Sequence, residues 1–183
     1  PPADVACRVD ALLGLARLER TAARPDSAAA LARVAGGLAA PDAAAASRVA
    51  TFQEAAGDTS GALETWRARV AADDLDLAAL DGFARTALAL DADLEDATRC
   101  AVRAVVLSDR DPVRMLQLAE LYARRALYGR ALKWIGEARA AAPDEPRYAA
   151  AEQAYREAQA RDPWGYGASA RTRSDLRGAG RPG

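Results

Sequence analysis

The sequence repeats a pattern of small and bulky residues at a step of about 34 residues. The clearest match relates four residues to four others by the same displacement of 34 positions: Leu94, Ala97, Ala101 and Ala104 correspond to Tyr128, Ala131, Ile135 and Ala138. A period in this range is typical of solenoids in which each repeat is one pair of helices that stacks on the next pair. The spacing therefore predicts a helical repeat protein.

The composition agrees with an all-α fold. The chain of 183 residues is 51% hydrophobic but only 5% aromatic. Much of the apolar content is alanine, which, with leucine, arginine and glutamate, forms helices readily, whereas β-branched residues are sparse. Small side chains also allow helices to pack closely. The composition thus favours an all-α fold without a sheet.

Prolines, glycines and aspartates divide the chain into segments of helical periodicity. Pro112 is well placed as the first residue of a helix, and Asp26 or Ser27 could cap another helix. The pattern predicts nine helices, over residues 9–20, 28–38, 43–56, 60–72, 76–90, 94–107, 112–126, 128–142 and 146–160.

These helices suggest three regions along the chain. Residues 1–8 are expected to be a leader, and residues 161–183 a disordered tail rich in glycine and arginine, in which Trp164 and Tyr166 could dock locally. Between them we expect four repeats and a closing helix, at residues 9–42, 43–77, 78–111, 112–145 and 146–160. Tyr148, Glu152, Gln153 and Arg156 are expected to give the closing helix the polar side that the end of a solenoid requires.

The pattern resembles the tetratricopeptide repeat (TPR) over about residues 9–160. Bulky residues and a closing proline match that family best in the fourth repeat, at Leu118, Tyr122, Tyr128 and Pro143. The family has three small residues in each repeat, which here fall on Ala16, Ala28 and Ala35; Ala50, Ala62 and Arg69; Arg85, Ala97 and Ala104; and Ala119, Ala131 and Ala138. The resemblance implies a right-handed α-solenoid of about four helix-turn-helix repeats with a C-terminal capping helix.

Several kinds of chemistry lack the residues that they need. The chain has no histidine, which removes the usual general base and the commonest zinc ligand. Its glycines do not form a phosphate-binding loop, and its acidic clusters at residues 73–76 and 91–96 lack the ligand spacing of a calcium loop. We therefore expect no catalytic, metal or cofactor site.

Charge, hydropathy and cysteine usage limit the partners further. The formal net charge is -1, with 25 basic and 26 acidic residues, so nucleic acid is not an expected partner. No apolar run approaches the roughly 20 residues of a membrane-spanning helix. Cys7 and Cys100 are expected to be unpaired, because several helices should separate them. The arginine-rich basic content, with Lys133 as the only lysine, suggests a bacterial source; cytoplasm and periplasm both stay open.

The resemblance implies a protein-interaction module that holds a partner protein or peptide on its concave face, which the first helix of each repeat would line. Only Arg17 and Arg20 could meet the negative end of a peptide, so we expect a shallow, mixed groove suited to a protein segment rather than to a terminal carboxylate. The alternative is an accessory region of a larger multidomain enzyme, for example one with a thioredoxin-like domain upstream. The residues expected on the concave face are Leu13, Arg17, Arg20, Ser47, Thr51, Glu54, Thr86, Leu116 and Glu120.

Overall fold

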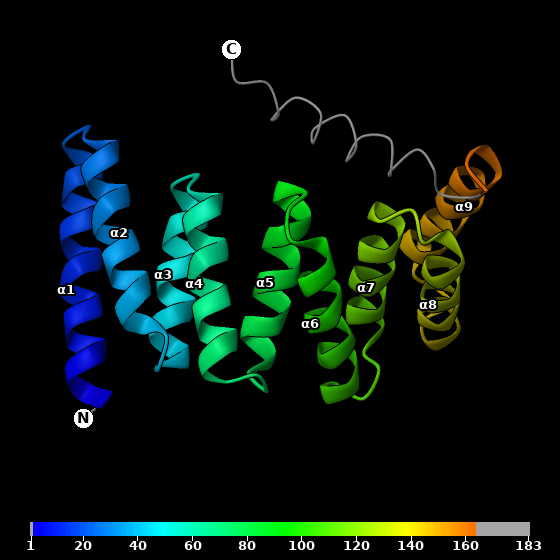
Figure 1. Cartoon of the computed structure of the whole chain (residues 1–183), viewed down its shortest axis with the longest axis horizontal. Coiled ribbons are helices and arrows are strands. Elements are labelled where there is room, and N and C mark those ends of the chain that lie inside the picture. Colours follow the sequence, from blue (N-terminus) through cyan, green and yellow to red (C-terminus); the bar gives the residue numbers. More distant parts are fainter. Residues whose placement is uncertain (1, 164–183) are drawn as a thin grey trace, which may run out of the picture. The chain divides into compact units, whose positions relative to one another are not determined.

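The computed structural model describes residues 2–163, and every regular element in this range is an α-helix (Figure 1). The helices are α1 (Pro2–Thr21), α2 (Pro25–Ala39), α3 (Ala43–Ala55), α4 (Thr59–Ala72), α5 (Leu77–Leu90), α6 (Leu94–Leu107), α7 (Pro112–Arg124), α8 (Tyr128–Ala141) and α9 (Pro146–Arg161). The predicted fold class is confirmed. The expected tail from residue 164 onward, with Trp164 and Tyr166, lies outside the described residues.

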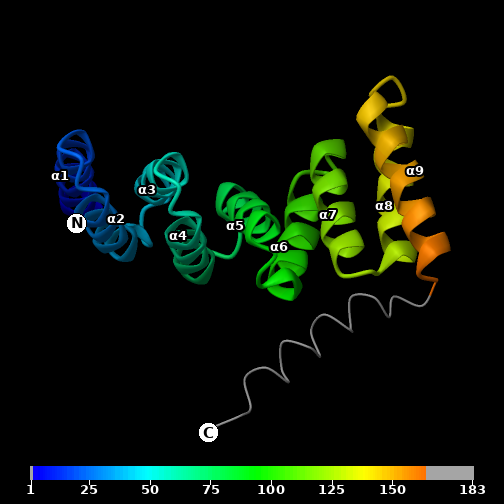
Figure 2. The same cartoon turned by 90° about the horizontal axis from the view of Figure 1, so that it is seen from above.

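The chain divides into an N-terminal unit, residues 1–107, and a C-terminal unit, residues 108–183. In the N-terminal unit α1 packs on α2, α3 on α4, and α5 on α6. The helix α1 also contacts α3, α2 contacts α4, and α3 contacts α5. Two layers result, which Figure 2 shows from above: a first-helix layer of α1, α3 and α5, and a second-helix layer of α2, α4 and α6.

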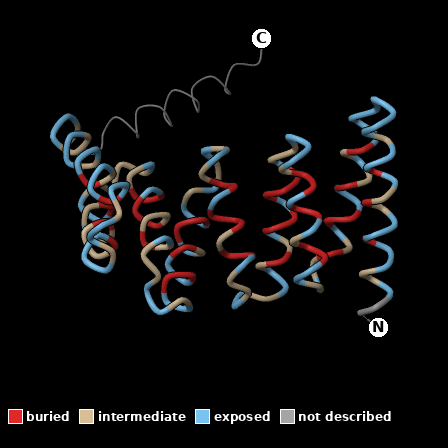
Figure 3. Tube along the Cα trace, turned by 180° about the vertical axis from the view of Figure 1, so that it is seen from behind, coloured by how far each residue is buried: buried red, intermediate tan, exposed pale blue. Residues whose placement is uncertain are grey.

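Alanines occupy the positions where these helices approach one another most closely. The small-residue positions predicted in the N-terminal unit are at most 2% exposed at Ala16, Ala28, Ala35, Ala50, Ala62, Ala97 and Ala104. In Figure 3 the buried positions follow the sides of the helices that face their neighbours. Because a larger side chain at such a position would push two backbones apart, the alanine spacing determines how the pairs stack.

Two arginines were expected at small-residue positions, and they differ in burial. Arg85 is exposed, and the buried position belongs to its neighbour Ala84, which is 0% exposed and follows Ala50 by 34 residues. The expected assignment of Arg85 was therefore wrong by one residue. Arg69, in contrast, is buried, at 7% exposed.

Aspartates begin most of the helices for which a cap is resolved. The side chains of Asp42, Asp58, Asp76 and Asp111 each accept a hydrogen bond from a backbone amide in the first turn of α3, α4, α5 and α7, respectively. Such a bond pairs one of the amides that a helix start leaves without a partner. These aspartates explain why the helix starts could be located from the sequence.

The first two helices begin earlier than the sequence indicated. Helix α1 begins at Pro2, so residues expected to form a leader belong to it, and Asp4 lies in its first turn where a negative charge is favourable. Helix α2 begins at Pro25, with Arg24 at the N-cap position and no capping side chain. Asp26 therefore lies inside the first turn of α2 and does not cap it. A proline at the first position suits a helix start because its missing amide hydrogen has no partner there.

The C-terminal unit consists, in its described part, of α7, α8 and α9, with α8 packed on both neighbours. Leu118 and Ile135 are 0% exposed and contribute to its core. On α9, Tyr148 and Glu152 were expected on a polar outer side but are 2% and 8% exposed. Glu152 tolerates burial because Arg139 donates to its Oε2 at 2.9 Å and Arg156 donates to its Oε1.

Candidate functional site

A surface hollow of about 380 Å³ lies between α1 and α3 in the N-terminal unit. This volume is near the lower end of the roughly 300–1,000 Å³ found for small-ligand sites. We call it the α1–α3 hollow; it is lined by Arg17, Arg20, Ser47, Arg48, Thr51, Phe52 and Ala55. Four of these were among the residues expected to bind a partner: Arg17, Arg20, Ser47 and Thr51.

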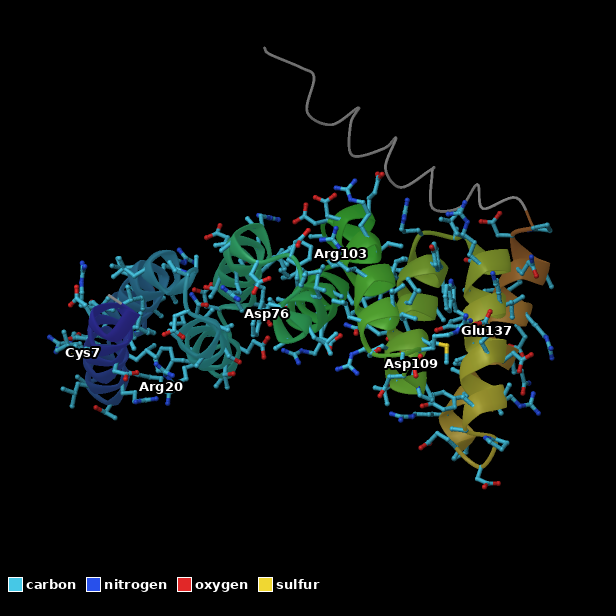
Figure 4. All side chains as sticks on the ribbon, turned by 90° about the horizontal axis from the view of Figure 1, so that it is seen from below. Cys7, Arg20, Asp76, Arg103, Asp109 and Glu137 are labelled. Atoms are coloured by element: carbon cyan, nitrogen blue, oxygen red, sulfur yellow. The ribbon has the colours of Figure 1, made fainter. Side chains whose placement is uncertain are left out.

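Helical spacing brings the lining residues together. Arg17 and Arg20 are three positions apart on α1, and Ser47, Thr51 and Ala55 follow one another at intervals of four on α3. Residues at these spacings share one side of a helix. The two sides face each other because α1 packs beside α3, and Figure 4 shows Arg20 on the α3 side of α1.

Leu13 was expected on the same surface but belongs to the core. It is 1% exposed and clusters with the buried residues Val9, Ala16 and Val49. Its apolar side chain is therefore unavailable to a partner, and the α1 wall of the hollow consists of the arginines that follow it.

The positive charges of the hollow are only partly balanced. Within residues 2–163, Arg17 has neither an ion pair nor a hydrogen bond from its side chain. The guanidinium carbon of Arg20 lies 5.2 Å from the centre of the Phe52 ring, which is a cation–π contact. Arg48 pairs with Asp10 at 3.2 Å, but both side chains are well exposed, so this pair is weak.

Glu54 follows Thr51 by one turn of α3, and its carboxylate is already engaged. Arg85 donates to Glu54 Oε1 at 2.9 Å, the Thr86 hydroxyl lies 3.3 Å from the same oxygen, and Trp66 Nε1 lies 3.5 Å away. Thr86 is only 2% exposed, and its hydroxyl is also 2.7 Å from the carbonyl oxygen of Gly82. The predicted residues Glu54 and Thr86 are thus joined to each other, where they connect α3 to α5.

The last two predicted residues, Leu116 and Glu120, lie on α7 in the C-terminal unit. Leu116 is half-buried and Glu120 is exposed. Nearby protein atoms withdraw the Glu120 carboxyl from water and raise its pKa, although Arg124 and Arg147 act in the opposite direction. Burial, and secondarily the charge of Glu120, raise the pKa of Tyr155 on α9. Glu120 therefore interacts electrostatically with Arg124 on its own helix and with Arg147 and Tyr155 on α9.

Three lining residues were missing from the sequence prediction. Ala55 could have been found by extending the Ser47–Thr51 spacing by one more turn. Phe52 is 7% exposed, yet it lines the hollow. Arg48 gave no signal that separates it from other exposed arginines.

A second hollow, of about 310 Å³, lies among α4, α5 and α6 of the same unit. This α4–α6 hollow is lined by Arg67, Val70, Ala71, Phe83, Asp96, Arg99, Cys100 and Arg103. Each of its arginines has an aspartate partner: Arg67 pairs with Asp93, Arg99 with Asp96, and Arg103 with Asp74.

Cys100, in the α4–α6 hollow, is half-buried, and burial raises the pKa of its thiol. A raised pKa lowers the share of reactive thiolate near neutral pH. Cys7 is exposed, and both cysteines are free thiols.

The described residues were searched for metal sites and for membrane-spanning helices. Residues 2–163 contain no group of three or more metal-binding side chains that could hold an ion. None of the helices in this range combines the length and the apolar character of a membrane-spanning helix. The α1–α3 hollow instead offers cations, hydroxyl groups and an aromatic ring, a set suited to holding a ligand.

Solved structures identify the fold. A crystal structure of MamA is 14% identical to this chain, with a TM-score of 0.65, and the match covers 84% of this chain and 83% of MamA. MamA from Desulfovibrio magneticus RS-1 is 10% identical with a TM-score of 0.64, covering 95% and 98% of the two chains. A thermophilic TPR protein from Thermus thermophilus is 21% identical with a TM-score of 0.52, covering 92% and 98%.

At these identities the likeness concerns the fold alone. No protein-family model matches the sequence, and no curated protein sequence matches it. The chain has a TPR-like helical repeat fold, as its repeat spacing predicted.

Proposed function

We propose that this chain is a non-enzymatic protein-interaction module that binds a segment of a partner protein at the α1–α3 hollow. The observation that carries the proposal is the presence of two exposed arginines without acidic partners, Arg17 and Arg20, opposite the hydroxyl groups of Ser47 and Thr51. Exposed polar groups that the fold leaves available are the groups that a partner can use.

The size of the hollow supports a peptide segment as the ligand. About 380 Å³ accommodates a few side chains of an extended segment, and the hollow is largely open to solvent. A helical repeat scaffold is suited to this task because its stacked helices hold the contact residues without a loop rearrangement. The TPR-like fold of the chain agrees with such a role.

The other residues that were predicted to bind a partner have different roles. Glu54 and Thr86 stabilise the neighbouring α3–α5 contact and thereby hold the α3 wall in place. Leu116 and Glu120 are proposed as a separate contact region on α7. Leu13 supports the hollow from the core.

Site-specific photo-crosslinking tests this proposal. A photoreactive amino acid replaces Thr51 in the hollow, and in a matched control it replaces Arg99, an exposed residue of the second-helix layer. Both proteins are exposed to light in extract of the source cells, and crosslinked proteins are identified by mass spectrometry. We expect a partner that crosslinks at position 51 and not at position 99.

Competition then separates specific from incidental crosslinks. Excess wild-type chain should suppress the crosslink at position 51, whereas excess Arg17→Ala/Arg20→Ala chain should not. Equal crosslinking at both positions, or equal competition by both chains, would refute the α1–α3 hollow as the binding site.

A further inference from the structure

The two hollows of the N-terminal unit form a natural comparison. They are similar in volume, at about 380 and 310 Å³, and each contains three arginines and one phenylalanine. They differ in how the charges are compensated. All three arginines of the α4–α6 hollow have an aspartate partner, whereas in the α1–α3 hollow only Arg48 has one.

From this difference we infer that the segment bound in the α1–α3 hollow is acidic, with an aspartate or glutamate next to an aromatic or aliphatic residue. The inference rests on the proposed function and adds the chemistry of the partner. A surface with unbalanced positive charge favours a negative partner both at encounter and in the bound state.

The contact between Arg20 and Phe52 prepares one of the arginines for a carboxylate. The guanidinium is placed over the ring, with 5.2 Å between its carbon and the ring centre, and its charge is not neutralised by an acid. A cation–π contact does not pair the guanidinium with an acidic acceptor, so N–H groups of Arg20 stay available to a ligand. Those groups can donate to both oxygens of a carboxylate in the fork geometry that arginine provides.

The opposite wall supplies further donors and an apolar surface. Ser47 and Thr51 present hydroxyl groups from successive turns of α3, and Ala55 extends the same side of that helix. The Phe52 side chain, 7% exposed, adds an aromatic surface to the lining of the hollow. A carboxylate placed between the two walls would thus have an apolar surface beside it, which explains the preference for an apolar neighbour in the sequence of the partner.

The nearest acidic groups of the chain do not oppose this partner. Asp10 is balanced by Arg48, and Glu54 accepts from Arg85 at 2.9 Å. Glu19, which lies between the two arginines in the sequence, pairs with Arg24 at 2.7 Å. Arg17 and Arg20 therefore determine the sign of the field at the hollow.

Selection from a peptide display library tests the inference. The library is random in sequence and is displayed with a blocked or fused end, so that a free terminal carboxylate cannot supply the negative charge. It is selected against the full chain, against the double variant Arg17→Gln/Arg20→Gln, and against Arg99→Gln as the matched control. Glutamine keeps hydrogen-bonding capacity but removes the charge.

We expect the full chain and Arg99→Gln to enrich the same peptides, with aspartate or glutamate beside an apolar residue. The double variant should lose this enrichment. For a selected peptide, each single arginine variant should weaken binding roughly tenfold, because hydrogen bonds to charged groups are among the stronger ones. Replacing the acidic residues of the peptide by their amides should have a similar effect, and added salt should weaken the wild-type complex.

The other outcomes contradict the inference in distinguishable ways. Neutral or basic peptides that bind the full chain but not the variant Thr51→Trp would leave the hollow as a binding site and refute an acidic partner. Acidic peptides enriched equally by the double variant would place anion binding elsewhere and refute the inference. No enrichment by the full chain would count against both the inference and the proposed function.

Discussion

Arg69 is the residue that departs most from the expected repeat pattern. It stands where the family has a small residue, yet it is buried and makes three well-placed contacts. Its Nε donates to Asp76 at 2.6 Å, its Nη2 to Asp73 at 2.7 Å, and its Nη1 to the carbonyl oxygen of Ala40 at 3.1 Å. Through these bonds one side chain joins the end of α2, the end of α4 and the start of α5. In Figure 4, Asp76 lies between α4 and α5.

Replacing Arg69 with methionine should therefore destabilise the chain strongly. The hydrocarbon part of the side chain is retained, but a largely buried carboxylate at Asp76 loses its partner. Breaking a buried ion pair in this way typically costs about 3–5 kcal/mol. Urea unfolding followed by circular dichroism measures the change in the free energy of unfolding.

The matched control is Arg99→Met, which removes an ion pair between exposed side chains, and should change the free energy of unfolding by less than about 1 kcal/mol. Equal stability of Arg69→Met and wild type would mean that the three contacts of Arg69 do not support the fold.

Single residues also show the limit of sequence reasoning. Arg69 and Arg85 both looked like exceptions to the small-residue pattern, but only Arg69 is buried. Ala84 and Arg85 are adjacent, and in an alanine-rich chain the repeat can be aligned through either position. The partners of Arg69 come from three separate places in the fold, so no local pattern could reveal that it would be satisfied in the interior.

At the scale of helix packing, Gly82 allows α5 to approach α4. A Cβ atom at Gly82 would lie 2.4 Å from the Trp66 ring, and Trp66 is only 4% exposed, so the ring has little room to move. Gly14 on α1 offers a contrast, because a Cβ there would meet nothing within 4 Å. These two glycines separate the effect of packing from that of backbone entropy.

Alanine at these two positions should have opposite effects on stability. Gly14→Ala should stabilise the chain by up to about 1 kcal/mol, since alanine favours the helix. Gly82→Ala gains the same preference but forces Trp66 to shift, and overpacking of this kind costs about 1–3 kcal/mol. Thermal unfolding of both variants under one set of conditions provides the measurement. A stabilising Gly82→Ala would show that Trp66 moves freely.

Two capping aspartates should make the stability of the chain depend on pH. Burial alone would raise the pKa values of Asp58 and Asp76, but hydrogen bonds from Arg33 and Arg69, respectively, and from backbone amides outweigh it and lower both. A carboxyl whose pKa is lower in the folded state contributes stability above its ordinary value of 3.8. That contribution is lost as the pH falls through the folded-state pKa.

The variant Asp76→Asn should show this linkage. Asparagine also caps helices well, so the substitution removes the charge and retains a capping group. We expect wild type to exceed Asp76→Asn in stability near neutral pH and the difference to shrink as the pH falls below about 4. Urea unfolding at several pH values gives both curves. A difference that is constant with pH would contradict the role of the charge.

The elements were predictable where their ends carry local signals. Proline, glycine and aspartate located most helix ends, whereas the start of α1 was predicted too late although Pro2 and Asp4 lie in its first turn. The residues of the α1–α3 hollow were partly predictable, because Arg17, Arg20, Ser47 and Thr51 follow from helical spacing alone. The burial of Leu13 and the contribution of Phe52 depend on how far α1 and α3 approach each other, which spacing does not specify.

At the scale of the whole chain, the stacked pairs of the N-terminal unit are joined by a repeated ion pair. Arg33 on α2 donates to Asp58 at 3.0 and 3.1 Å, and Arg67, which follows it by 34 residues, pairs with Asp93. Each pair connects the second helix of one repeat to the start of the second helix of the next. The repeat spacing thus applies to the ion pairs between neighbouring helix pairs as well as to the small residues.

Residues 1–107 should consequently fold without the rest of the chain. The unit contains three helix pairs, which is about the minimum for a stable repeat array. Its core includes a continuous cluster across α1, α2 and α3, and its inter-repeat ion pairs lie within it. We expect the isolated fragment to give dispersed amide resonances that match those of the full chain at Ser47, Thr51 and Gly82. It should also bind the peptides selected by the full chain with unchanged affinity.

An unfolded fragment would show that residues 108–183 are required for the N-terminal unit to form. A folded fragment that has lost peptide binding would show that the α1–α3 hollow is not sufficient for binding.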